Sequence, residues 1–532
     1  MRARAGDPPR TMTQKIVGGR QEEGQPDSDI AKVRIDQVIL ARSSSALLNQ
    51  VLDPSLKRFA VEVAVAYEGQ CLSLGDGASH VASGAVVPRA LLNKGLQIAR
   101  PGIGFAAAVH LERFGSPARL ALTDDPRLCA VGGAGTLVLL AAPHQLAEAL
   151  ATGWATIRVP RSVQVLLAGK LRPFVGVRDV ALELERQGLG DVVRRIEVET
   201  GAPVVLEFSG PSVRLLPVHD RALLAGVAPH IGAAGALFIS DEKTEVFLRD
   251  QRRSKAHRGL SPDPGAPSDA AITLDLSTLD PLARDEKGRV VTVRELQGRT
   301  VQQVILGGDT GASLRELLAV ATLLKSKRVP AGLDLLVAPS SRQAMEVLAR
   351  SGALVDLIAT GARLIEPDAR LLTGEAYGCA PDETSLRTFE TDLSPVGSAP
   401  ILASPETAAQ TVTTGVIGDP RAFKRPVRVN LPRVLPTDDV LLLRKAKPRA
   451  KGDPELAAAS DVAAPARPKW QSQNTLSPAA HPRSDRSPTL LVAPSLSAAM
   501  EVGRRAPDLG IWALAAPRVP QALAGALAAQ GV

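Results

Sequence analysis

Short runs of Val, Ile and Leu alternate with segments of helically spaced apolar residues over most of this chain, and that alternation limits its fold more than any other feature. The runs are typical of buried strands, and the segments between them place apolar residues three or four positions apart, as on one face of a helix. Strands that alternate with helices build parallel sheets with helices on their faces. The pattern therefore predicts an α/β protein of layered domains.

The same pattern gives the elements of two α/β blocks. The first is predicted to hold strands at 33–40, 59–66, 163–167 and 203–208 and helices at 143–151 and 179–186. The second is predicted to hold strands at 301–306, 333–338, 357–360 and 400–403 and helices at 313–325 and 341–351.

Breaks in composition set the predicted domain boundaries. At about 100–200 residues per domain, 532 residues correspond to several domains. Stretches rich in Pro, Gly, Ser and charge interrupt the alternation and indicate linkers or disorder. We expect a disordered leader at 1–28, two α/β domains at 29–250, a connection at 251–270, a third α/β domain at 271–446, a disordered linker at 447–488 and a βα segment at 489–532.

The C-terminal segment repeats part of the third domain. Residues 335–350 (LLVAPSSRQAMEVLAR) and 490–505 (LLVAPSLSAAMEVGRR) agree at eleven of sixteen positions. The repeat is either a duplicated βα unit with a function or a decayed copy that packs at an edge. Two copies are too few for a solenoid.

Composition excludes several classes of protein. Three cysteines are too few for a disulfide framework, and their spacing matches no metal motif. No run is long and apolar enough for a membrane span, and the N-terminus has no apolar signal region, so we expect a cytoplasmic protein without membrane contact. The net charge of +8 comes from interspersed basic and acidic residues and does not itself indicate a partner.

Several strings then occur in a characteristic order. They are RPGIGFAAAVHLERF at 100–114, VQVLLAGKLRPFVGVRDV at 163–180, PVVLEFSGPSV at 203–213, VQQVILGGDTGASLRELLAVA at 301–321, SLRTF at 385–389 and ASPETAA at 403–409. Together they resemble the aconitase and isopropylmalate dehydratase large-subunit family over residues 30–440. The resemblance implies an aconitase-type fold, with layered α/β/α domains around a central cleft, followed here by the linker and a short C-terminal α/β piece.

The resemblance also implies a cofactor that this chain lacks the residues to hold. Members of the family dehydrate 2-hydroxy and tricarboxylic acids at a [4Fe–4S] cluster held by three cysteine thiolates, the soft ligands that iron–sulfur chemistry requires. The matching positions here are Asp309, Ala369 and Leu372. Cys379 would approach the site only if its loop folded back. We therefore expect no cluster and no other cofactor.

The acid–base residues of the family are also mostly missing. By resemblance, Glu68, Asp125 and Glu207 are the surviving catalytic carboxylates, and Arg127 stands where a histidine is expected and is the candidate substrate-binding residue. A second expected histidine is Ala107, and the string near the N-terminus is altered at 41–44. No arginine occurs at 390–397, where arginines that bind substrate carboxylates are expected.

Two further features have simple interpretations. His110 lies in an apolar block and is predicted to be a packed core residue. Residues 249–258 (RDQRRSKAHR) form a basic segment that would meet phosphate or RNA, but aromatic residues for base stacking are sparse, so a solvated loop is favoured.

The sequence thus favours a cluster-free pseudoenzyme with a binding, scaffold or regulatory role. One alternative is an active hydro-lyase or isomerase that uses a partner subunit, or a hard divalent metal at Asp309 with Asp125 and Glu207. A second is RNA binding through the basic segment 249–258, which substitutions of Arg252 and Arg253 would test. The family's catalytic serine lies in a Gly-Ser-Ser-Arg string of a swivelling domain, which this chain lacks, so a small swivel-domain subunit is an expected partner, and a small carboxylic acid an expected ligand of the cleft.

Overall fold

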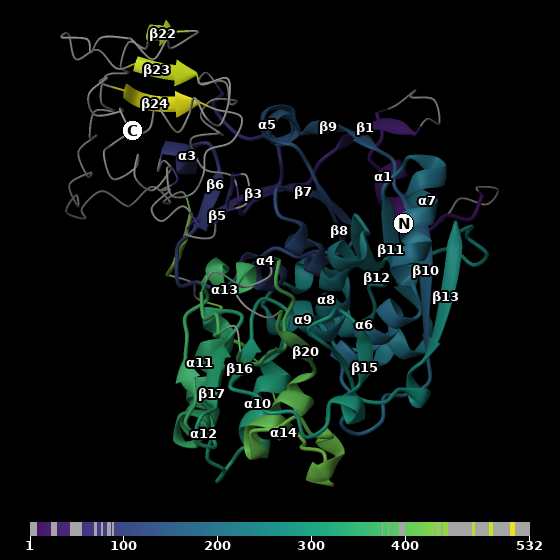
Figure 1. Ribbon diagram of the computed structural model, residues 1–532. Coiled ribbons are helices and arrows are strands. Elements are labelled where there is room, and N and C mark those ends of the chain that lie inside the picture. Colours follow the sequence, from purple (N-terminus) through teal and green to yellow (C-terminus); the bar gives the residue numbers. More distant parts are fainter. Residues whose placement is uncertain are drawn as a thin grey trace, which may run out of the picture. The chain divides into compact units, whose positions relative to one another are not determined.

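Three sheets of mainly parallel strands, covered by helices, form residues 1–445 in the computed structural model of the protein (Figure 1). The parts of the chain that the structure describes are residues 8–22, 29–42, 56–68, 72–75, 78–81, 87, 90–374, 376–380, 382–392, 399–429, 431–432, 434–437, 440–444, 471–473, 489–492 and 511–515. Among these residues, no helix combines the length and the apolar character that crossing a membrane requires.

The first lobe is built on a six-stranded sheet. Its order is β21 (Leu442–Leu443), β6 (Leu96–Ala99), β3 (Val63–Tyr67), β2 (Gln37–Leu40), β7 (Arg119–Thr123) and β8 (Thr136–Leu140), and only β21 runs antiparallel to its neighbour. Apolar residues of α1 (Met12–Gly18), α3 (Ala90–Asn93) and α5 (Pro143–Thr152) pack on one face. The other face carries α4 (Ala106–Arg113) and the 3-10 helix η1 (Pro126–Ala134). Smaller antiparallel pairs join β1 (Ile30–Arg34) to β9 (Trp154–Arg158) and β4 (Leu72–Gly75) to β5 (Ala78–Val81).

The second lobe is a four-stranded, wholly parallel sheet. Its order is β12 (Gly235–Phe238), β11 (Val204–Ser209), β10 (Arg161–Ala168) and β13 (Ala270–Asp275). Its core includes apolar residues of α6 (Val177–Arg186), α7 (Leu189–Thr200) and α8 (Val218–Val227), and α9 (Glu242–Asp250) follows β12.

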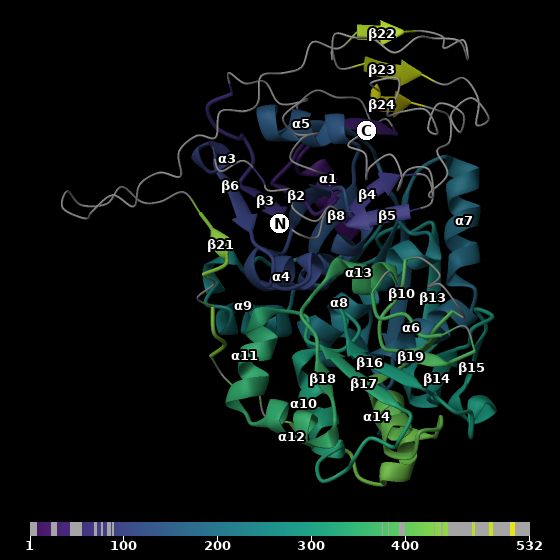
Figure 2. The same cartoon turned by 60° about the vertical axis from the view of Figure 1, so that its left-hand side comes forward.

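The third lobe holds a seven-stranded mixed sheet. Its order is β15 (Val290–Thr292), β14 (Leu282–Arg284), β20 (Ile401–Ala403), β19 (Ser385–Arg387), β16 (Gln303–Gly307), β17 (Asp334–Ala338) and β18 (Arg363–Leu364). Around it lie α10 (Leu314–Leu323), α11 (Arg342–Arg350), α12 (Ala353–Thr360) and α14 (Pro405–Thr414). Figure 2 shows α4 of the first lobe next to the short helix α13 (Ala369–Thr373) of the third, and the candidate site lies there.

Residues 446–532 form a separate unit. Its described residues are three parallel strands in the order β22 (Gln471–Gln473), β23 (Thr489–Val492) and β24 (Ile511–Ala515). The repeated Leu-Leu-Val string therefore lies on the middle strand of a parallel triplet, as it does on β17 between β16 and β18. Most of the predicted linker at 447–488, and the helix predicted within 490–505, lie outside the described residues.

The structure corrects four of the sequence-based expectations. Residues 357–360, predicted as a strand, end helix α12, because a short apolar run does not distinguish the two. Part of the predicted disordered leader forms α1, whose first amides are bound by a carboxylate from another lobe. Strand β13 belongs to the second lobe and β21 to the first, although both fall at or within the predicted third domain. The predicted interdomain connection at 251–270 instead joins α9 to β13 within the second lobe, and its Leu260 is buried.

Candidate functional site

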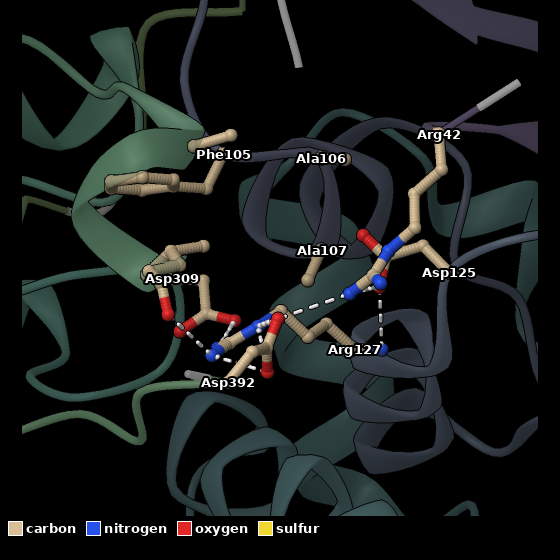
Figure 3. A pocket seen from close by; sticks show the side chains of 10 residues that line it. Arg42, Phe105, Ala106, Ala107, Asp125, Arg127, Asp309 and Asp392 are labelled. Carbon is tan, nitrogen blue, oxygen red and sulfur yellow. Dashed lines mark hydrogen bonds and ion pairs between the residues drawn. The ribbon is translucent and has the colours of Figure 1, made fainter. Parts of the chain in front are cut away.

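A small pocket lies between the first and third lobes, where the ends of several strands and helices meet (Figure 3). It contains all three positions that the resemblance assigns to cluster ligands. Its lining residues are Arg42, Phe105, Ala106, Ala107, Asp125, Arg127, Asp309, Ala369, Leu372 and Asp392. The chain thus folds so that the expected ligand positions converge, although none of them carries a thiol.

Asp309 is positioned by the tight turn that ends β16. Gly308 has φ +81°, and a Cβ at this residue would lie 2.6 Å from Cγ of Phe389, so the turn requires glycine there. Oδ1 of Asp309 accepts a hydrogen bond from the Thr310 amide at 2.8 Å, which leaves Oδ2 facing the first lobe. The carboxylate is buried, with its side chain 3% exposed.

Arg127 enters this space from the first lobe. Asp125 caps η1 by accepting from the Arg127 amide at 3.0 Å, and the Arg127 side chain extends across the pocket with 7% exposure. Nη1 donates to Oδ2 of Asp309 at 2.9 Å, Nε donates to both oxygens of Asp392 at 3.1 Å, and Nη2 donates to the carbonyl of Glu390 at 2.7 Å. Every nitrogen of the guanidinium therefore has a partner in the third lobe.

Arg42 makes a second bridge between the lobes. The amides of Ala41 and Arg42 donate to Oδ1 of Asp124, which fixes the chain after β2. Nη2 of Arg42 then lies 3.1 Å from Oδ1 of Asp125 and 3.0 Å from Oδ2 of Asp392. Figure 3 shows Asp392 near both guanidinium groups.

Burial and these pairings shift the titration of the site in different directions. Burial raises the pKa of Asp125, although Arg42 and Arg127 oppose the shift. Burial acts in the same direction on Asp392, but Arg127, together with Arg42 and His230, more than offsets it, and the pKa of Asp392 is lowered. Burial by itself would lower the pKa of Arg127, whereas Asp309 and Asp392 raise it above the ordinary value. Arg127 and Asp392 are accordingly held as ions.

The donor set at this site does not fit an iron–sulfur cluster. A cubane of this family needs three thiolates, and the positions offer one carboxylate, one methyl group and one isobutyl group. The carboxylate is at hydrogen-bonding distance from a guanidinium, so no iron lies within reach of Oδ2 without displacing Arg127. No described cysteine compensates: Sγ of Cys379 contacts the Glu383 carbonyl and Sγ of Cys129 the Ala234 carbonyl, and Cys71 lies outside the described residues.

Two of the predicted catalytic carboxylates lie elsewhere. Glu207 is on β11, where its oxygens accept from the amides of Met12 and Thr13 at 2.9 and 2.8 Å and from the Ser162 hydroxyl at 3.1 Å. It thus anchors the first turn of α1, and it does not line the pocket. Glu68 follows β3 and accepts from the Val87 amide at 2.9 Å, also outside the pocket lining. Asp125 and Arg127 are the two predicted site residues, apart from the three cluster positions, that the structure brings together.

The geometry gives little support to the two alternative functions, a metal-dependent enzyme and an RNA-binding protein. Among the described residues, no group of three His, Cys, Asp or Glu side chains is arranged to hold a metal ion, and Glu207 is not beside Asp309. In the basic segment, Arg253 donates to the carbonyls of Glu112 and Gly115, which leaves it structural rather than free for RNA. The prediction for His110 is confirmed: it is fully buried between Tyr67 and Gln37, with hydrogen bonds of 3.1 and 3.0 Å.

Sequence reasoning missed Arg42 and Asp392. The resemblance places substrate-binding arginines after the SLRTF string, and 390–397 has none. The structure instead supplies arginines to the pocket from the first lobe and an aspartate from the third. Two charge changes in the strings that match the family indicate that the pocket contains paired charges: a basic residue at 127 and an acidic residue at 309. Neither change identifies Arg42 or Asp392.

The chain is similar in sequence to one family of known proteins. The model of the aconitase family (aconitate hydratase) matches residues 88–288. The 3-isopropylmalate dehydratase large subunit 2 of Archaeoglobus fulgidus is 28% identical over 433 residues, which are 78% of this chain and 99% of that protein. Large subunit 1 of Thermotoga maritima is 29% identical over 62% of this chain and 79% of its own length. Large subunit 1 of Deinococcus radiodurans is 28% identical over 77% and 94%.

Proposed function

We propose that the chain is a cluster-free member of the aconitase and isopropylmalate dehydratase large-subunit family, with a binding, scaffold or regulatory role. The observation that carries this proposal is the buried ion pair between Arg127 and Asp309, at a position where the family has a cluster thiolate. Ala369 and Leu372 complete the set, and neither side chain can coordinate iron.

The charges of the pocket further support a non-catalytic role. Dehydration of a hydroxy acid needs a positioned base and an acid of tuned pKa. Asp125 is tied to Arg42, Asp309 to Arg127 and Asp392 to both arginines, so each carboxylate holds a guanidinium rather than a reacting proton. A substrate carboxylate would have to displace these aspartates from the arginines.

The proposal is tested by metal content and activity together. We expect protein purified and reconstituted anaerobically with iron and sulfide to stay colourless and to leave citrate, isocitrate and isopropylmalate unchanged. A cluster-bearing relative, treated in parallel, shows that the reconstitution works. Iron and sulfide near about four per chain would refute the proposal.

A small-subunit partner is part of the same proposal. The relatives are named large subunits, and this chain has no Gly-Ser-Ser-Arg string of its own. Co-expression with a swivel-domain protein from the same genome, followed by native mass measurement, tests this part. A stable heterodimer without dehydratase activity is expected, and a chain that stays free of the swivel protein at micromolar concentration would contradict it.

A further inference from the structure

We infer that Arg127 takes over the structural work of the missing cluster: it ties together the segments of the third lobe that carry the ligand positions, and it also joins them to the first lobe. The inference rests on the proposed absence of the cluster. Arg127 is assigned a structural role that a cluster would otherwise have, and Arg127 is predicted to exclude the cluster from the site.

The contacts of Arg127 reach the same backbone segments that would hold iron. One of the expected ligand positions follows β16, and Arg127 binds it through Asp309. The other two lie on α13, where Nη2 of Arg127 is 3.4 Å from the Leu372 carbonyl. A further segment, after β19, is bound through the Glu390 carbonyl and Asp392. Three segments of the third lobe thus converge on one guanidinium.

The charges explain why the arginine and the aspartate belong together. A buried guanidinium without a carboxylate, or a buried carboxylate without a guanidinium, is strongly unfavourable, because desolvation is not compensated. Asp309 and Asp392 surround Arg127, and the side chain of Asp309 is only 3% exposed. A neutral alanine or leucine at the two α13 positions adds no charge to this balance.

The same geometry makes cluster and arginine mutually exclusive. Nη1 of Arg127 and Oδ2 of Asp309 are 2.9 Å apart, which is an ordinary hydrogen-bond length with no atom between them. Apolar contacts close the remaining side: Phe105 of the first lobe packs with Leu371, Leu372 and Phe389 of the third in one buried cluster. Thiolates restored at the ligand positions would therefore face a guanidinium instead of open space.

The test restores the ligands with and without the arginine. One variant carries Asp309→Cys, Ala369→Cys and Leu372→Cys; a second adds Arg127→Ser to make room. A control adds Arg294→Ser, an exposed arginine, to the three cysteines. After anaerobic reconstitution, we expect iron and sulfide to bind only where Arg127 has been removed, at least tenfold above the other two variants.

The results separate this inference from the proposed function. Equal loading of the triple-cysteine variant with and without Arg127 would overturn the inference, whereas loading of the unmodified protein would overturn the proposed function. If no variant loads, hydrogen exchange decides. Arg127→Lys should speed amide exchange at 369–374 and 387–392 at least tenfold while β10 and β11 stay unchanged. Exchange that is unchanged everywhere, or faster by the same factor everywhere, would overturn the inference.

Discussion

Replacing Arg127 by methionine should destabilise the protein by about 3–5 kcal/mol, the usual loss when one partner of a buried ion pair is removed. Methionine is close to arginine in volume, so the packing of the site is nearly unchanged. The lost free energy of unfolding therefore measures mainly the removal of the charge and its hydrogen bonds. The substitution leaves Asp309, which is 3% exposed, without its cation and removes the hydrogen bonds to Asp392 and to the Glu390 carbonyl.

A matched control comes from an exposed arginine of the third lobe. Arg294 pairs with Asp419 at 3.2 Å, but its side chain is 65% exposed, so Arg294→Met should cost below about 1 kcal/mol. Arg127→Lys should fall between the two, because an ammonium keeps the charge but lacks the planar fork that reaches three partners.

The second partner completes a double-mutant cycle. Asp309→Leu alone should cost less than Arg127→Met, because Arg127 keeps Asp392. The double variant should cost less than the sum of the single losses by at least about 1 kcal/mol.

Urea unfolding followed by far-ultraviolet circular dichroism measures each loss, provided that the slope of free energy against urea is the same in all variants. Two results would refute the reasoning: an Arg127→Met loss as small as that of Arg294→Met, or single losses that simply add in the double variant.

Three further predictions concern other parts of the fold. Burial raises the pKa of Asp179 to about 7 and also raises that of Glu406, so these two side chains hold more protons in the folded chain than in the unfolded one, and their contribution to stability falls as pH rises from about 4 to 8; burial lowers the pKa of His110 and His219, which act in the opposite direction. The urea midpoint of Glu406→Gln should therefore rise relative to that of the unmodified protein over this range, and a constant difference between the two would contradict this. Gly104→Ala should lower the free energy of unfolding by about 1–3 kcal/mol more than Gly95→Ala does. Both glycines have positive φ, but only at Gly104 would a Cβ meet backbone, 2.7 Å from Cα of Ser341. Equal losses would show that this close approach does not require glycine. Burial raises the pKa of the Cys129 thiol to about 12, so alkylation at neutral pH should require unfolding, and rapid labelling of the native protein would contradict its burial.

Only the strands with a strong apolar run of their own could be predicted from the sequence. The segments at 163–167, 203–208 and 333–338 are rich in Val and Leu, and the structure has strands there. The segment at 357–360 has the same composition but lies at the end of a helix that begins after Gly352, and only its position in the lobe decides between the two.

Helix α1 could not be predicted from its own residues. It has seven residues, too few to be stable alone, and its capping box at Thr11 is a weak local signal. Its first amides are bound by Glu207, which is 195 residues away from Met12 in the sequence. The same contact explains why Glu207, predicted as a catalytic remnant, lies on a structural interface instead.

Of the candidate site, too, the sequence predicted one part and not the other. That Asp309, Ala369 and Leu372 lie together followed from the resemblance, since the order of the strings carries the fold. That Arg127 pairs with Asp309, and Arg42 with Asp392, did not follow from it. These partners are separated by 182 and 350 residues and belong to different lobes, so no local pattern links them.

The sequence by itself determined the α/β class, the resemblance to the aconitase and isopropylmalate dehydratase large-subunit family and the absence of thiols at the three positions that match its ligands, because these depend on residue types and on their order. Only the tertiary structure decided what stands in the place of the thiols. Hydrogen bonds and ion pairs act over a few ångströms, and which charges come that close depends on how the lobes pack. In this protein the packing brings two arginines of the first lobe against two aspartates of the third.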